Sequence, residues 1–405
     1  MRRIYCWLAL GAVAASSLGC RDDPALAPYS VVLPPAAEYV AHLPSDNAFD
    51  YYATAAQQIQ ETSTDDLFRT SFARAKRREL LAENSASLDL LLQAVEVPCE
   101  FLFRHQPPFE ERANHRGWRL AGRMLTWKIE QAVAEEDWDE AVAWTIATVH
   151  FGLQLTGGDL VDSTLGWSIA DRGRIAIASD LYRIPSDNLY SLQDGVDAAL
   201  KARPSEISSL DHEMESMLSA IQALQDAHRQ GDFSAIRDHL GSQSRSVNTF
   251  QRLRGEERED FIEGMMAETR DRIEHHQQEI TLAASQRQPF RPASDDRPWA
   301  QLSRQFLETV EPYIAVRDRA LARTRLLAAN AYVQARLNDE GIEPGALDGL
   351  VGPEVVDPYT GDRLRYMAAG TDSFVYSVGS NWLDDGGDSD RLGVSPDLRL
   401  EAPGL

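Results

Sequence analysis

Cysteine is scarce in this sequence, and the few that are present form no pairing pattern. The 405 residues include only Cys6, Cys20 and Cys99. They make neither a CxxC pair nor the even, closely spaced set of a disulfide framework. Cys99 is not accompanied by the His and Asn pattern of a nucleophilic cysteine, so we expect it to be a small buried thiol.

The chain also lacks an excess of basic residues. It carries 40 Lys and Arg against 63 Asp and Glu, a formal net charge of −23, and has no basic stripe. Such a chain repels phosphate backbones, so nucleic-acid binding is excluded as an expected function. The acidity favours cations or basic partners. The hydrophobic content of 43% is enough for folded cores, and the length suggests two or three domains.

Familiar catalytic motifs are missing as well. The sequence contains no GxSxG, no HExxH, no P-loop, and no GxGxxG ahead of a helix. Acid pairs such as Asp65–Asp66 and Glu135–Glu136 are typical of surface charge. The sequence therefore favours a non-enzymatic protein, although a catalytic site assembled from distant residues stays open.

Apart from the N-terminal segment, no apolar run is long enough to cross a membrane. That segment has a basic start at Arg2 and Arg3, an apolar run over 4–15, small residues and then Cys20. It resembles a bacterial lipoprotein signal, although Ser17 stands where that family usually has leucine. The resemblance implies cleavage after residue 19 and lipidation of Cys20. An ordinary signal peptide or an uncleaved anchor is the alternative.

The segment 20–44 is rich in proline and alanine, which predicts an extended tether. Together with a lipid on Cys20, it places the folded part at a membrane of the bacterial cell envelope, facing the periplasm or the outer surface.

Helical periodicity dominates residues 45–287, and we expect an irregular multi-helix domain there. The clearest unit is a helical hairpin over 117–155, in which Asp137 is expected to cap the second helix and Glu140 to complete a capping box. The run 136–144, EDWDEAVAW, resembles the turn and second helix of a tetratricopeptide repeat. No second copy follows at the expected period, so a repeat array is not predicted.

A proline-rich linker over 288–299 is expected to end this domain. A second, small α+β domain over 300–405 would follow, with one long helix that ends at Gly341 and that Pro312 is expected to kink. Two strand-like runs, RLRYMA and SFVYSV, are separated by the four-residue turn AGTD. The predicted fold class is therefore mainly α, with a short antiparallel sheet near the C-terminal end.

This last quarter resembles the globular head of the major pseudopilins of type II secretion. The resemblance rests on the order of four short motifs after the long helix, with these residues: Gly341, Pro344, Leu347, Leu350, Asp357, Pro358, Gly361, Tyr366, Phe374, Tyr376, Ser377 and Gly379. It implies a helix packed on a small antiparallel sheet. The family's N-terminal transmembrane helix is missing here, and a fold likeness alone does not carry a function.

The stretch FVYSVGSNWLDDGGDSD ends in a loop with four closely spaced aspartates. In the pseudopilins the corresponding loop binds calcium, although that family has Asp-Gly where this chain has Asn381 and Trp382. Calcium takes six to eight oxygen ligands, and the glycine pair lets the backbone turn. A structural Ca²⁺ site is one interpretation, and a solvated acidic turn is the other. The residues predicted to bind calcium are Asp384, Asp385, Asp388 and Asp390.

The leading hypothesis is a lipid-anchored envelope protein that acts as a non-enzymatic interaction or scaffold protein with an unidentified protein partner. One alternative is a component of a secretion or pilus-like machine, which the head resemblance favours and the missing transmembrane helix opposes. The other is a hydrolase with its site in the α-helical domain.

Overall fold

The described part of the chain is mainly α-helical, with one small antiparallel sheet close to its C-terminal end, which confirms the predicted fold class. The computed structural model describes residues 46–62, 74–101, 114–234, 236, 245–291, 297, 299–341, 347, 349–350, 352–368, 373–387 and 397–400.

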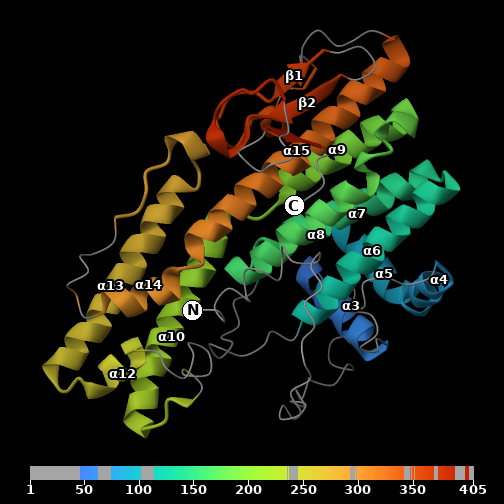
Figure 1. Ribbon diagram of the computed structural model, residues 1–405. Helices are drawn as coiled ribbons and strands as arrows, with labels where there is room; N and C mark the ends of the chain where they lie inside the picture. Colours follow the sequence, from blue (N-terminus) through green and yellow to red (C-terminus); the bar gives the residue numbers. More distant parts are fainter. Residues whose placement is uncertain are drawn as a thin grey trace.

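A bundle of long helices forms the centre of the molecule (Figure 1). The helices α6 (His115–Glu135), α7 (Trp138–Leu155), α8 (Leu160–Ala178) and α9 (Ser186–Ala202) follow one another along the chain. The much later helix α15 (Val310–Glu340) packs against α8 and α9. The helix α7 contacts α6, α8 and α9, and most of its side chains are buried.

The turn between α6 and α7 lies where the sequence predicts it. Glu136 closes α6 in the left-handed conformation, with φ 57°. The Asp137 carboxylate accepts the backbone N–H of Glu140 at 3.1 Å, which satisfies one of the free N–H groups at the start of α7. The other half of the capping box differs, because the Glu140 carboxylate accepts the indole N–H of Trp144 at 3.3 Å.

The two helices α7 and α8 approach backbone to backbone where glycine faces glycine. A Cβ built on Gly166 would lie 2.4 Å from the carbonyl oxygen of Gly152, and one built on Gly152 would lie 2.5 Å from the carbonyl oxygen of Gly166. Only glycine leaves room for this approach. Gly117 of α6 has the same role against Ala56 of the helix α3 (Ala48–Thr62), where a Cβ would lie 2.3 Å from the Ala56 carbonyl oxygen.

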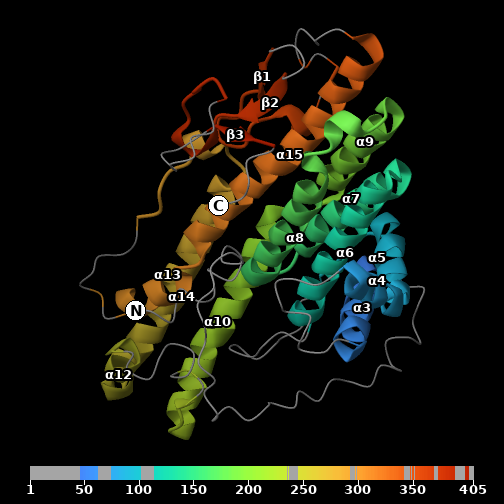
Figure 2. The same ribbon diagram turned by 45° about the vertical axis from the view of Figure 1, so that its right-hand side comes forward.

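Three shorter helices cover one side of the bundle. They are α3 (Ala48–Thr62), α4 (Arg74–Glu83) and α5 (Ser85–Gln93), and α3 packs on both α6 and α5. Figure 2 shows them stacked on the side of α6 away from α9.

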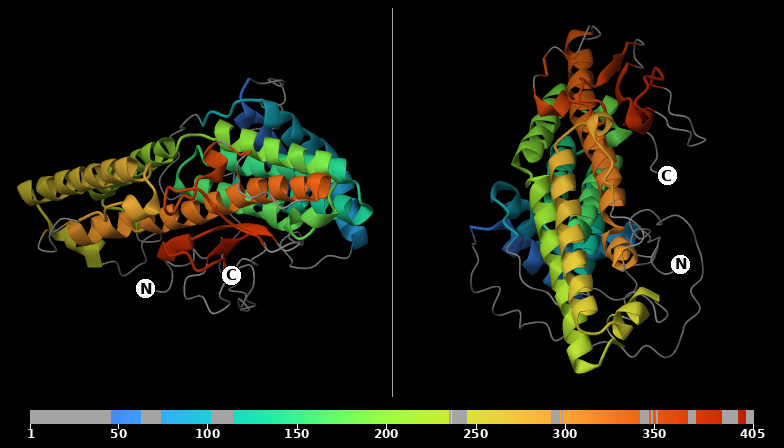
Figure 3. Two further views of the ribbon diagram at one scale, coloured as in Figure 1. Left: turned by 90° about the horizontal axis from the view of Figure 1, so that it is seen from above. Right: turned by 90° about the vertical axis from the view of Figure 1, so that its left-hand side faces the viewer.

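A helical arm extends from one end of the bundle. Its two long members, α10 (Glu206–Gln230) and α13 (Glu256–Glu279), lie side by side and project beyond the bundle, as Figures 1 and 3 show. The shorter helices α12 (Arg245–Arg252) and α14 (Ala300–Leu307) pack together, and α14 also packs on α13. We call α10, α12, α13 and α14 the arm.

The long helix is not kinked at Pro312 as predicted but is interrupted just before it. The chain leaves α14 at Leu307 and starts α15 at Val310, so Pro312 lies in the first turn of a new helix. Proline is tolerated there because the first N–H groups of a helix have no intrahelical partner.

The small sheet lies on the outer side of α15. Its strands β1 (Arg365–Met367), β2 (Phe374–Ser377) and β3 (Leu398–Arg399) are antiparallel in the order β1-β2-β3, and both β2 and β3 pack on α15. The first two strands match the predicted strand-like runs, whereas β3 was not predicted. Single-turn 3₁₀ helices also occur: η2 (Ala94–Glu96), η3 (Leu181–Arg183), η4 (Ala284–Gln286), η5 (Pro353–Val355) and η7 (Gly379–Asn381).

One continuous apolar cluster joins side chains of the bundle, the arm and the sheet. The residues after the predicted linker thus share a hydrophobic core with the helices that precede the linker. The domain boundary at 288–299 stays a prediction. No helix within the described ranges is long and apolar enough to span a membrane.

Candidate functional site

The acidic loop after η7 carries two of the four predicted calcium ligands in the described part of the chain. Asp384 and Asp385 lie on its exposed surface. Asp388 and Asp390, like the predicted lipidation site Cys20, lie outside the described residues. The loop is shaped by three residues with positive φ: Trp382 at 61°, Gly386 at 72° and Gly387 at 75°. Trp382 occupies a conformation that glycine favours.

Asp384 is tied to the sheet. Its Oδ1 accepts the phenolic O–H of Tyr376 at 2.8 Å and the backbone N–H of Gly386 at 3.1 Å, and Arg365 Nε lies 3.6 Å from its Oδ2. The hydrogen bond from Tyr376 is the main reason that the pKa of Asp384 is lowered. The first aspartate of the loop is therefore held ionised against β2.

A fifth aspartate, which the sequence did not single out, lies beneath the loop. Asp397 is fully buried, and its Oδ2 accepts the backbone N–H groups of Asp385 at 3.0 Å and of Gly387 at 2.6 Å. Its other oxygen, Oδ1, is buried without a hydrogen-bond partner. Burial raises the pKa of Asp397, and the neighbouring carboxylates of Asp385 and Asp384 raise it further. An added cation would relieve this repulsion.

These described carboxylates do not by themselves complete a metal site. Within the described ranges no three His, Cys, Asp or Glu side chains are grouped so that they could hold a metal ion. Calcium takes six to eight oxygens, so Asp384, Asp385 and Asp397 would form only part of its shell.

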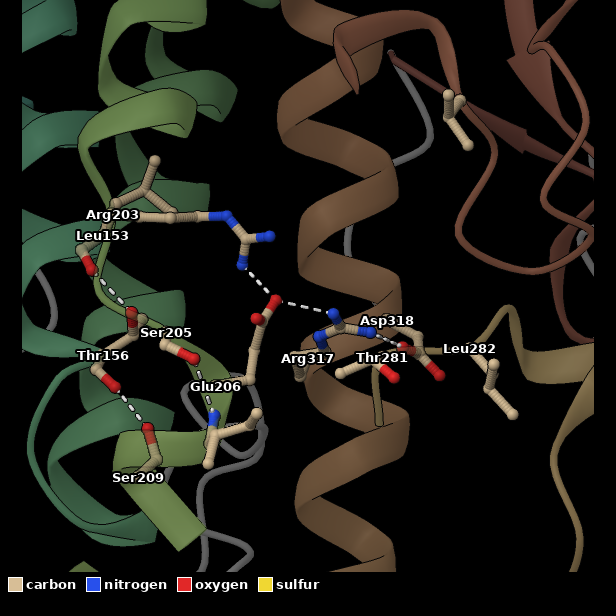
Figure 4. Close-up of polar contacts among 12 residues, drawn as sticks. Leu153, Thr156, Arg203, Ser205, Glu206, Ser209, Thr281, Leu282, Arg317 and Asp318 are labelled. Carbon is tan, nitrogen blue, oxygen red and sulfur yellow. Dashed lines mark hydrogen bonds and ion pairs between the residues drawn. The ribbon is translucent and has the colours of Figure 1, made fainter. Parts of the chain in front are cut away.

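A second polar cluster lies inside the molecule, between the start of the arm and α15 (Figure 4). It is an alternating row of charges that we call the charge chain, in this order: Arg203, Glu206, Arg317, Asp318 and Arg287. Arg203 lies in the turn between α9 and α10, and Glu206 is the first residue of α10. Arg317 and Asp318 belong to α15, and Arg287 follows η4.

Glu206 links the first two arginines of the charge chain. Its Oε1 accepts hydrogen bonds from Arg203 Nη1 and, at 2.6 Å, from Arg317 Nη2. Burial alone would raise the pKa of Glu206, but Arg317 and Arg203 outweigh it and lower the pKa to about 2. The carboxylate is therefore ionised at neutral pH and neutralised by two guanidinium groups.

Asp318 joins the other end of the charge chain. It accepts Arg317 Nη1 at 2.6 Å and forms two hydrogen bonds with Arg287, at 2.5 Å from Nη1 and 3.0 Å from Nη2. Such bidentate pairs are among the strong hydrogen bonds of proteins. The charge chain thus fixes both the entry to α10 and the segment after α13 against α15.

The sequence motif DPxxG provides one further buried acid, Asp357. Its carboxylate accepts the N–H of Tyr359 at 2.9 Å, the hydroxyl of Ser377 at 3.0 Å and the N–H of Val378 at 2.9 Å. These contacts attach the turn to β2, so Asp357 has a structural role.

A buried His–Asp pair lies elsewhere in the bundle. His115 Nε2 is 2.5 Å from Asp162 Oδ1, and both side chains are buried. The pair connects the start of α6 to the start of α8, where Asp159 caps the helix by accepting the N–H groups of Val161 and Asp162.

The charge chain was missed by the sequence reasoning. A signal for it was present, because the middle of α15 carries four arginines, Arg317, Arg319, Arg323 and Arg325, among mostly apolar residues. Arginine is rarely buried unless it is paired, and the sequence does not identify the partner.

Comparison with protein-family models, with curated proteins and with solved structures finds no match to this chain.

Proposed function

We propose that this chain is a lipid-anchored protein of the bacterial cell envelope that binds a protein partner and carries a structural calcium loop. The N-terminal pattern supports the anchor: a basic start, an apolar run, Cys20 and a proline-rich tether to residue 44. The lipid would hold the folded part at the membrane surface.

The arm supports the interaction role. It projects from the bundle (Figure 3), so its outer faces are open to a partner. The outer face of α13 is strongly acidic at its start, where these side chains are exposed: Glu256, Glu257, Glu259, Asp260 and Glu263. Opposite charge steers association, so a partner with a basic surface suits the arm.

The observation that carries the calcium part of the proposal is the unpartnered Oδ1 of Asp397. A fully buried carboxylate oxygen without a donor is costly, and this one belongs to a carboxylate that the charges of Asp384 and Asp385 disfavour. Calcium is a hard cation that prefers oxygen ligands. It would bind the unpartnered oxygen and offset the repulsion among the three carboxylates. Asp384, Asp385 and Asp397 would hold it, with the predicted ligands Asp388 and Asp390. Its chemistry there would be structural, because it would pin the loop to the sheet.

Calcium is therefore expected to raise the unfolding temperature of the full-length protein in detergent. A site filled at a hundred times its Kd stabilises a fold by about 2.7 kcal/mol. The effect should be larger at pH 7 than at acidic pH, because the raised pKa of Asp397 leaves that carboxyl protonated in acid and without need of a cation. The measurement is thermal unfolding by circular dichroism across a calcium titration, with magnesium as the competing ion.

The matched variants are Asp397→Asn and Asp362→Asn. Asp397→Asn keeps the shape of the side chain and should lose most of the calcium effect, whereas Asp362 is exposed near the same sheet and should be silent. Equal calcium responses in wild type and Asp397→Asn, or no response at millimolar calcium, would reject the structural site.

A further inference from the structure

The helices α4 and α6 carry a surplus of positive charge in a chain that is acidic overall. Each of them holds four Lys and Arg against two Glu. Subtracting their combined charge of +4 from the −23 of the whole chain leaves −27 for the rest. No basic stripe was predicted from the sequence, and the fold forms a basic surface from two separate segments.

Side-chain contacts join the two helices into one surface. The guanidinium carbon of Arg77 in α4 lies 5.5 Å from the ring centre of Trp127 in α6, and Arg77 Nη1 lies 2.6 Å from Glu130 Oε2. One residue further along α4, Arg78 Nη2 lies 3.7 Å from Glu135 Oε1. The arginines of α4 therefore lie along α6.

Three arginines of α6 continue this surface toward the start of the helix. Arg116, Arg119 and Arg123 are three and four residues apart, and Trp127 follows after four more, so the four side chains share one helix face. The guanidinium carbon of Arg123 lies 5.2 Å from the Trp127 ring centre, so this indole contacts an arginine from each helix. We call the following set the basic face: Arg74, Arg77, Arg78, Arg116, Arg119 and Arg123.

The basic face is exposed, and its charges repel one another. Arg74, Arg78 and Arg119 are exposed residues, and 65% of the Arg78 side chain is accessible to solvent. The pKa of Arg123 is lowered, first by burial and then by the positive charges of Arg172 and Arg77. A negatively charged surface against this face would relieve the repulsion.

The basic face and the acidic arm lie on opposite sides of the bundle. Figures 1 and 2 show α4 on one side and α12, with the adjoining start of α13, on the other. The predicted tether ends at residue 44, and α3, which begins at Ala48, packs on α6. The tether therefore joins the folded part on the side that carries the basic face.

We propose that the basic face docks on the surface of a bilayer that contains anionic lipids, through the phosphates of their headgroups. This inference rests on the proposed lipid anchor, which would bring the face to the membrane. Guanidinium forks match the geometry of phosphate oxygens, and a lipid chain together with a basic patch holds a protein at a membrane more firmly than one chain alone. Docking in this orientation would turn the acidic arm away from the anionic surface and toward a partner.

The test measures vesicle binding without the anchor, so that its result does not depend on lipidation. The full-length chain with Cys20→Ser is sedimented with vesicles of phosphatidylcholine, alone or mixed with phosphatidylglycerol at about 7:3. We expect binding to the anionic vesicles to be at least about tenfold stronger, and the preference to disappear in about 1 M salt, which screens charges beyond about 3 Å. Equal binding to the two kinds of vesicle would overturn the proposal, even if Cys20 proves to be lipidated in the natural chain.

Variants of this Cys20→Ser chain locate the surface. Arg74→Gln combined with Arg119→Gln removes one exposed charge from each helix and should weaken binding to the anionic vesicles about fivefold per arginine. Arg229→Gln combined with Arg270→Gln is the control, because it removes two exposed charges from the arm and changes the net charge equally. The control should bind as the parent chain does.

Equal losses in the two double variants would show that net charge, and not the basic face, sets the binding, and would contradict the assignment. Sedimentation velocity without vesicles tests the other occupant of opposite charge, the acidic arm of a second copy. Self-association that the Arg74 and Arg119 changes abolish, with vesicle binding unchanged, would assign the face to a second copy and overturn membrane docking.

Discussion

The Gly166→Val variant is expected to lose more than about 4 kcal/mol of its free energy of unfolding, or to fail to fold. The new Cβ would lie 2.4 Å from the carbonyl oxygen of Gly152, a backbone atom that cannot move without separating α7 from α8. Because α7 also packs on α6 and α9, a shift of α7 disturbs those contacts as well.

The measurement for this variant is urea unfolding followed by far-UV circular dichroism. Ile175→Val is the matched control, since it also places a valine on α8 but at a side chain that is 50% exposed. The control should stay within about 0.5 kcal/mol of wild type. A Gly166→Val protein as stable as this control would contradict the close helix approach.

The Glu206→Gln variant is expected to lose about 3–5 kcal/mol, because it leaves Arg203 and Arg317 without their shared counter-charge. The same contact makes stability depend on pH. The pKa of Glu206 is about 2 in the folded chain against an ordinary value of 4.5. A lowered folded pKa gives stability that is present above about pH 4.5 and is lost as the pH falls toward 2. At neutral pH the lowered pKa of Glu206 contributes about 3 kcal/mol to the free energy of unfolding.

Unfolding of wild type and Glu206→Gln at a series of pH values tests whether the negative charge of Glu206 is what stabilises the fold. The difference between them should be largest at pH 6–7 and should shrink in acid, where wild-type Glu206 becomes protonated. Glu215→Gln, an exposed acid on the same helix, is the control and should follow wild type throughout. A difference that is constant down to pH 2 would show that the charge of Glu206 is not what stabilises the junction.

Local features of this fold could be predicted from the sequence because their causes are local. The α6–α7 hairpin follows from helical periodicity and a capping aspartate three residues from its hydrogen-bond partner. The strands β1 and β2 follow from two β-like runs around a short turn. Each depends on residues that are close along the chain, where spacing carries the information.

Features that join distant segments could not be predicted in this way. Glu206 and Arg317 are 111 positions apart, and nothing in the spacing of either indicates the other. Asp397 lies beneath the acidic loop because β3 returns beside β2, and β3 is only two residues long. The role of the facing glycines of α7 and α8 likewise depends on how the two helices pack, which the sequence does not show.

The central claim, that this is a lipid-anchored envelope protein, depends on Cys20. The most direct measurement is mass spectrometry of the N-terminal peptide from protein expressed at full length in bacteria, combined with separation of membrane and soluble fractions. We predict a peptide that begins at Cys20 and carries acyl chains, recovered with the membrane, and a Cys20→Ser variant that loses this modification. An unmodified Cys20, or a chain cleaved elsewhere and recovered in the soluble fraction, would contradict the claim.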